Sequence, residues 1–145
     1  MAVFEVRRAS RRPVEECWRR VTDWDRHSAL VPLTRVGLTA GERTQLGSTV
    51  LARTGVGPLG FDDPMEVVRW EPPPPGGTGR CRLEKRGSVV RGWAEIEVSA
   101  GGGGSLLLWR EEVRLRGFPR AVDPVVAAVG QRMFARVIDR LLRAP

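Results

Sequence analysis

The segment from Pro119 to Arg143 is the strongest constraint on the fold. Asp123 followed by Pro124 is typical of a helix N-cap and first turn. The apolar residues after them recur in steps of three and four, at Val125, Val126, Val129, Met133, Phe134, Val137, Ile138, Leu141 and Leu142. Arginines take most of the remaining surface. A long amphipathic helix of this kind needs a large apolar partner, so we expect the rest of the chain to provide one.

Upstream of this helix the pattern changes to short strands separated by glycine and proline. A strand near 3–8 is followed by a helix from Pro13 and by a bend or second short helix over 22–28. Six further strands are expected near 34–39, 47–54, 64–70, 79–86, 89–99 and 105–116. This order indicates a single α+β domain over residues 1–145, in which a curved antiparallel sheet holds the last helix.

Alternation along the last strands gives a tentative register. It places Val98 opposite Leu107 and Lys85 opposite Val90, so that one face of the sheet is apolar. The residues on that inward face would be Val90, Gly92, Ala94, Ile96, Val98, Leu107, Trp109, Glu111, Val113 and Leu115, joined by Cys81, Leu83 and Lys85 from the preceding strand.

Small residues on the inward face leave either close helix contact or an internal hollow, and the sequence leaves both open. A hollow would suit an apolar ligand. Access is expected past the glycine-rich segment 55–60 and the segment 24–31. The candidate ligand contacts are Trp109, Leu107, Ala94, Gly92, Cys81, Met133, Phe134, Val137, Trp24 and Phe61.

Glu111 is the main candidate for chemistry, because the alternation that buries Trp109 also turns this carboxylate inward. A buried carboxylate must be paired or protonated. The tentative register puts Arg69 in the same row. The two could form a salt bridge without chemistry, or a pair that orients a ligand or acts in acid–base catalysis. Lys85 lies near a strand end and is expected to be exposed.

Two other polar groups are given structural roles. Asp62 and Asp63 are adjacent and would point to opposite faces of a strand, so a turn leading into Pro64 is the preferred interpretation. His27 has no serine or cysteine placed to form a triad with it, and we expect it at the surface or in a cap.

The net charge of +7 and pI of about 11.2 invite a nucleic-acid interpretation. However, Lys85 is the only lysine among 24 basic residues, and the arginines are scattered through every segment. Scattered charge is typical of a GC-rich coding bias, and nucleic-acid binding needs a clustered patch. An interaction module for RNA or anionic lipid remains a third hypothesis.

Cys17, Cys81 and His27 are too few for a dedicated metal site, and we expect neither a metal nor a cofactor. The first ten residues lack the apolar core of a signal peptide, and no run approaches the length of a membrane span. We therefore expect a cytoplasmic protein with reduced thiols, either a monomer or a homodimer.

Three stretches carry a resemblance to a known family: Ala9-Ser10-Arg11-Arg12-Pro13-Val14-Glu15-Glu16-Cys17-Trp18 leading to Thr22-Asp23-Trp24, then Val67-Val68-Arg69-Trp70-Glu71-Pro72-Pro73, and the terminal helix. With these, the whole chain resembles the SRPBCC superfamily, the helix-grip fold of START lipid-transfer domains, the major birch-pollen allergen group and polyketide cyclase/dehydrase-like proteins. Residues 52–64 are similar to a signature of a bacterial subgroup that we associate with no assigned substrate. The resemblance implies a seven-stranded antiparallel sheet around the last helix, with an apolar cavity between them.

The resemblance also implies what such a cavity holds: lipids, sterols, polyketides or hormones, with some members cyclising or dehydrating polyketide chains. Cyclases of this fold place polar side chains, often tyrosine, deep in the pocket, and this chain has no tyrosine. We therefore expect a binding protein for a small hydrophobic or amphipathic molecule. The alternative is a cyclase/dehydrase-type enzyme that uses Glu111 and Arg69.

Overall fold

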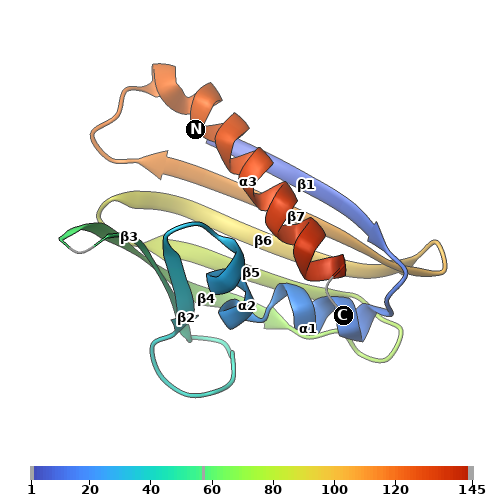
Figure 1. The fold of residues 1–145 in the computed structure, drawn as a ribbon. Helices are drawn as coiled ribbons and strands as arrows, with labels where there is room; N and C mark the ends of the chain where they lie inside the picture. The colour runs from blue at the N-terminus through green and yellow to red at the C-terminus, as the bar shows by residue number, and fades with distance from the viewer. Residues whose placement is uncertain (1, 57, 144–145) are drawn as a thin grey trace.

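The structure is a computed structural model, and it describes residues 2–56 and 58–143. Seven antiparallel strands form one curved sheet in the order β1-β7-β6-β5-β4-β3-β2. The long helix α3, Asp123–Arg143, lies across its concave face (Figure 1). The other elements are β1 (Ala2–Ser10), α1 (Val14–Val21), α2 (Trp24–Leu30), β2 (Thr34–Leu38), β3 (Thr49–Val56), β4 (Leu59–Glu71), β5 (Gly79–Arg86), β6 (Val90–Gly101), β7 (Gly104–Leu115) and the 3₁₀ helix η1 (Arg120–Val122). The predicted α+β fold is confirmed.

The sequence patterns predicted which elements are present more accurately than where each one ends. The bend or short helix expected over 22–28 is a helix, α2, at Trp24–Leu30. Asp23 caps it by accepting a hydrogen bond from the backbone N–H of Arg26 at 3.4 Å. Strands β3 and β4 extend into the segment 55–60, which the sequence predicted to be a loop, and Gly55 pairs with Gly60 there. Gly57 of that segment lies outside the described residues.

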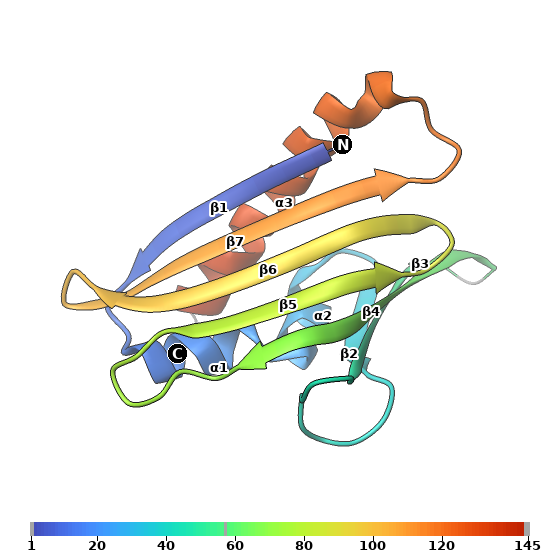
Figure 2. The same ribbon diagram turned by 180° about the vertical axis from the view of Figure 1, so that it is seen from behind.

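Among the residues that the structure describes, no helix covers the convex face of the sheet (Figure 2). Its strands present alternating charges to solvent, and neighbouring strands pair them, as between Arg82 and Glu95 and between Arg80 and Glu97 at 2.9 Å. Exposed pairs of this kind contribute little to stability. Because successive side chains of a strand point to opposite faces, the residues between these charged ones face the helix.

The predicted register is right for one hairpin and wrong for the next. Val98 lies opposite Leu107, as expected. Lys85 pairs with Gly92 instead of Val90, which is a shift of two residues. Because side chains alternate with a period of two, this shift keeps each residue on its predicted face and changes only its neighbours.

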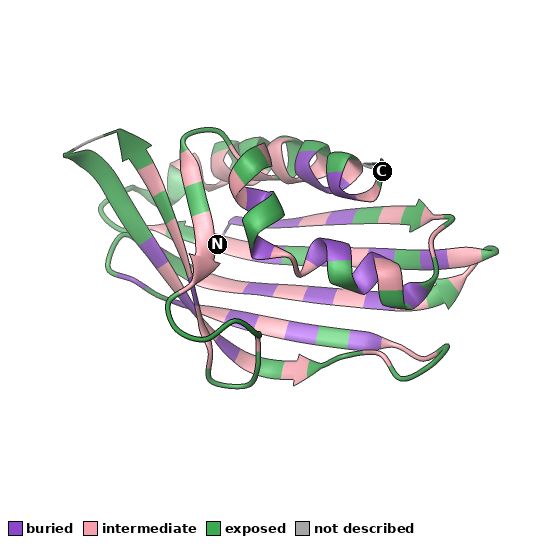
Figure 3. Cartoon of the chain, turned by 60° about the horizontal axis from the view of Figure 1, so that its bottom comes forward, coloured by how far each residue is buried: buried purple, intermediate pink, exposed green. Residues whose placement is uncertain are grey.

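The two halves of α3 are packed differently. Val137, Ile138 and Leu141 in the second half are buried, whereas Val125 and Val129 in the first half are exposed (Figure 3). The first half therefore lies over a part of the sheet that it does not pack against tightly.

Arginines from the start of the chain hold the last turn of α3. Arg20 donates a hydrogen bond to the carbonyl oxygen of Leu141 at 3.0 Å, and Arg12 donates one to that of Leu142 at 2.8 Å. These carbonyls have no partner within the helix, so cationic donors are favourable there. The contacts fix the helix at its C-terminal end.

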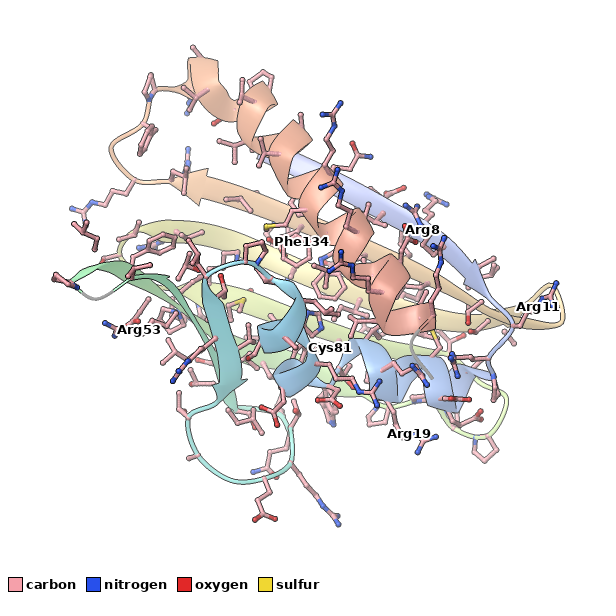
Figure 4. All side chains as sticks on the ribbon, in the orientation of Figure 1. Arg8, Arg11, Arg19, Arg53, Cys81 and Phe134 are labelled. Atoms are coloured by element: carbon pink, nitrogen blue, oxygen red, sulfur yellow. The ribbon has the colours of Figure 1, made fainter. Side chains whose placement is uncertain are left out.

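The arginines labelled in Figure 4 lie in four separate parts of the fold. Arg8 is in β1, Arg11 follows it, Arg19 is in α1 and Arg53 is in β3.

No helix within the described residues combines the length and the apolarity needed to span a membrane.

Candidate functional site

A cavity of about 500 Å³ lies between the concave face of the sheet and the first half of α3. Strand β6 contributes Ala94 to its floor, and α3 contributes Val129 and Met133 to its roof. The lining is mainly apolar, with a small number of polar side chains. This volume and composition are typical of sites for small organic molecules.

A row of five rings forms one wall of the cavity. Ring centroids are 5.6 Å apart for Trp24 and His27, 5.7 Å for His27 and Trp109, 5.4 Å for Trp109 and Phe134, and 5.6 Å for Phe134 and Phe4. The rings come from α2, β7, α3 and β1, and all five line the cavity. Spacings in this range are favourable for aromatic pairs. Four elements are thus held together along this wall.

His27 is fixed within this wall. It is buried, and its Nε2 lies 2.9 Å from the carbonyl oxygen of Val21. Because a carbonyl can only accept, Nε2 carries the hydrogen, and Nδ1 is the acceptor nitrogen of the neutral ring. Burial lowers the pKa of His27 below its ordinary value of 6.5, so the ring is neutral at pH 7.

Three charged side chains gather on the sheet side of the cavity. Lys85 of β5 donates a hydrogen bond from Nζ to Oδ2 of Asp63 in β4 at 2.8 Å. The same Nζ lies 3.8 Å from Oε2 of Glu111 in β7. Lys85 reaches β7 across β6, where Gly92 and Ala94 offer almost no side chain to block it. We call Asp63, Lys85 and Glu111 the polar cluster.

Burial is the main influence on the pKa of the Glu111 carboxyl. This residue is only 4% exposed, and burial raises the pKa of its carboxyl above the ordinary 4.5, although Lys85 opposes the shift. Trp109 donates a hydrogen bond from Nε1 to its Oε1 at 3.4 Å.

Lys85 keeps its charge in spite of its burial. Burial alone would lower its pKa, but Glu111 and Asp63 outweigh that effect, and its pKa lies above the ordinary 10.5. Asp63 is the nearer of the two carboxyls. The polar cluster is thus a buried lysine between two carboxyls, with Asp63 as its hydrogen-bonded partner.

Six of the ten predicted ligand contacts line the cavity: Trp109, Ala94, Met133, Phe134, Trp24 and Phe61. Figure 4 shows Phe134 on the side of α3 that faces the sheet. Glu111 lines the cavity as well. That these residues contact a ligand remains a prediction.

The other four predicted contacts, Leu107, Gly92, Cys81 and Val137, do not line the cavity. Leu107, Cys81 and Val137 are each only 2% exposed, so other side chains of the protein cover them. Gly92 has φ of +131°, and a Cβ there would lie 2.0 Å from the carbonyl oxygen of Glu112. Backbone of the neighbouring strand therefore fills the space that the missing side chain was expected to leave.

The predicted pairing of Arg69 with Glu111 is wrong. Strand β4 is irregular between Val67 and Arg69, so that Val67 pairs with Leu83 but Arg69 pairs with Arg82. One extra residue in a strand moves the following side chains to the opposite face. Arg69 is consequently exposed on the convex side, where it pairs with Glu71.

Sequence reasoning placed Lys85, Asp63 and His27 outside the site, and the structure buries all three beside the cavity. For Lys85 the sequence did contain a pattern, because Lys85 continues the inward alternation of Cys81 and Leu83. Asp63 lies two residues before the buried Met65 in β4, so the same alternation turns both side chains inward. His27 had no local signal, because its contact with Trp109 of β7 joins segments that are distant in the chain.

The two cysteines are buried in the core and free. Burial raises the pKa of Cys81 to about 12 and also raises that of Cys17. Both thiols are therefore protonated at neutral pH, which makes them poor nucleophiles. Across residues 2–56 and 58–143, no group of three or more His, Cys, Asp or Glu is placed to hold a metal ion.

The raised pKa of Glu111 predicts a pH dependence of stability. The unfolded chain loses the Glu111 proton near pH 4.5, before the folded protein does, so this group reduces stability as pH rises from there through its folded pKa. Glutamine has no such proton. We expect Glu111→Gln to become more stable relative to the unmodified protein between pH 4 and pH 8 in urea unfolding.

Glu112→Gln is the matched control, because Glu112 is half-buried and its carboxylate accepts a hydrogen bond from Trp93 at 2.7 Å. It should show no such gain. Parallel curves of unfolding free energy against pH for Glu111→Gln and the unmodified protein would contradict the prediction.

No protein-family model matches this sequence, and no curated protein matches it. Solved structures do match, and over nearly the whole chain. Ara h 8.0201 is 16% identical, with 97% of each chain covered and a TM-score of 0.64. An AHSA1-like protein from Aeromonas hydrophila is 15% identical, with 98% of this chain and 92% of that one covered and a TM-score of 0.65.

A norcoclaurine synthase from Thalictrum, a point mutant in complex with a transition state analogue, is 13% identical. The match covers 97% of this chain and 92% of that one, with a TM-score of 0.62. Identities this low are informative about architecture only. On the strand order, the curved sheet and these matches, the chain has the same helix-grip fold as these solved structures.

Proposed function

We propose that this protein binds a small, mainly apolar molecule in the cavity between the sheet and α3. The observation that carries the proposal is the cavity itself, about 500 Å³ in volume and lined by apolar side chains with one polar cluster. Protein interiors are normally packed without voids of this size. A space of this kind, with a polar cluster on one side of it, is better suited to a ligand than to the core.

The packing of α3 supports the proposal. Its second half is buried in the core through Ile138 and Leu141, whereas its first half covers the cavity. Exposed apolar residues at Val125 and Val129 continue from the roof of the cavity to the surface. The norcoclaurine synthase structure, with its transition state analogue, adds that this fold can hold a small organic molecule.

Two measurements test the proposal. Native mass spectrometry of the purified protein, followed by solvent extraction, would detect a molecule that remains bound through purification. Titration with the neutral dye Nile red should give saturable binding at one site, with quenching of tryptophan fluorescence because Trp24 and Trp109 line the cavity. Dye binding that does not saturate, together with no bound molecule, would contradict the proposal.

A second candidate function is acid–base catalysis by Glu111. The observation in its favour is a fully enclosed carboxyl with a raised pKa, facing the cavity beside Lys85. Lys85 would take the role that was first assigned to Arg69. Chemical change of a bound molecule by the unmodified protein, lost in Glu111→Gln while binding persists, would favour catalysis over simple binding.

A further inference from the structure

The polar cluster contains an unsatisfied acceptor. Asp63 is 9% exposed, and its Oδ2 receives the hydrogen bond from Lys85, but its buried Oδ1 has no hydrogen-bond partner in the structure. Asp63 lines the cavity. A buried acceptor without a donor is costly, and such atoms are rare in folded proteins. A donor supplied from the cavity would remove this cost.

The donors within the cluster are already used. Lys85 directs its ammonium toward Oδ2 of Asp63, toward Sδ of Met65 at 3.6 Å and toward Glu111. The indole N–H of Trp109 is directed at Glu111. A bound molecule could therefore satisfy Oδ1 only by bringing its own hydrogen.

Charge balance limits what else that molecule can carry. The single cation of the cluster, Lys85, already lies between two carboxyls, 2.8 Å from Asp63 and 3.8 Å from Glu111. A carboxylate brought beside Asp63 would find no free cation there. It would be a buried charge without a partner, which an apolar site disfavours.

We propose that the ligand is an amphipathic alcohol or phenol whose hydroxyl group donates a hydrogen bond to Oδ1 of Asp63, and that the site rejects fatty-acid-like carboxylates. This inference rests on the proposed binding function. The hydroxyl end would lie on the sheet side of the cavity, between β4 and β7. The apolar body would extend along the aromatic wall toward Val129 and Met133 of α3.

The test compares molecules that share a ten-carbon chain and differ only at its end. Displacement of Nile red by 1-decanol, decane and decanoate is measured at pH 7. We expect 1-decanol to displace the dye at a concentration at least about tenfold lower than decanoate, and lower than decane. Equal or better displacement by decanoate, or by decane, would overturn the inference.

The variant Asp63→Asn connects the preference to this carboxylate. Asparagine has nearly the same shape but no charge, so Lys85 loses its hydrogen-bonded anion and can receive one from a ligand. The preference for 1-decanol over decanoate should fall by about tenfold or reverse. An unchanged preference would overturn the assignment to Asp63.

Asp62→Asn is the matched control. Asp62 is exposed on the same strand and pairs with Arg53 at 3.3 Å, away from the cavity lining. It should keep the preference of the unmodified protein. If Asp63→Asn does not fold, the comparison of the three probes on the unmodified protein still decides the question.

The outcomes separate the two proposals. If neither Nile red nor any of the three probes binds the unmodified protein, the binding function itself is wrong. If the dye binds and the probes compete without regard to their ends, only the hydroxyl inference is wrong.

Discussion

Replacing Lys85 with methionine should lower the free energy of unfolding by about 3 kcal/mol or more at pH 7. Methionine retains the apolar stem, so the change removes mainly the charge. Asp63 and Glu111 would then remain buried with no cation between them. Urea unfolding at pH 7 measures the effect.

Arg86→Met is the control for this substitution. Arg86 is the next residue in β5, half of its side chain is exposed, and it pairs with Glu84 at 3.0 Å on the convex face. Exposed ion pairs contribute at most about 1 kcal/mol. If Lys85→Met costs no more than Arg86→Met, the polar cluster does not hold the charges as described.

Replacing Ala94 with phenylalanine should abolish saturable binding of Nile red while the protein stays folded. Ala94 is 1% exposed, and its side chain faces the cavity between Glu111 and Leu83 on the neighbouring strands. A phenyl ring added there would take up ligand space on the floor. Overpacking of a core costs about 1–3 kcal/mol, and the open cavity should keep the cost at the low end. Dye titration and thermal unfolding measure the two expectations.

Ala9→Phe adds the same ring at an exposed position in β1. It should leave dye binding unchanged. Full dye binding by Ala94→Phe would show that the dye occupies another site, and the cavity would then lose its main support as the binding site.

The polar cluster shows where prediction from sequence fails. Alternation turned Glu111 inward correctly, because one face of each strand packs under the helix. Its partner could not be chosen in the same way. Pairing depends on the register of β5 with β6 and on the irregularity of β4 between Val67 and Arg69. Neither leaves a periodic trace in the sequence.

The shape of the cavity also could not be predicted from the sequence alone. Of the small inward residues Gly92, Ala94 and Cys81, only Ala94 lines the cavity. Backbone of β7 lies against Gly92, and Cys81 is buried in the core. His27 was expected at the surface, yet rings from α2 and β7 enclose it. These outcomes depend on contacts between segments that are distant in the chain.

The sequence by itself determined the elements, the inward faces of β6 and β7 and the α+β class, because helical and strand periodicities are local and glycine and proline mark where they stop. Only the tertiary structure decided which charged groups meet, which side of α3 packs tightly and whether the space beneath it stays open. Those features are set by strand register, by one irregular strand and by side-chain volumes that several elements contribute at once.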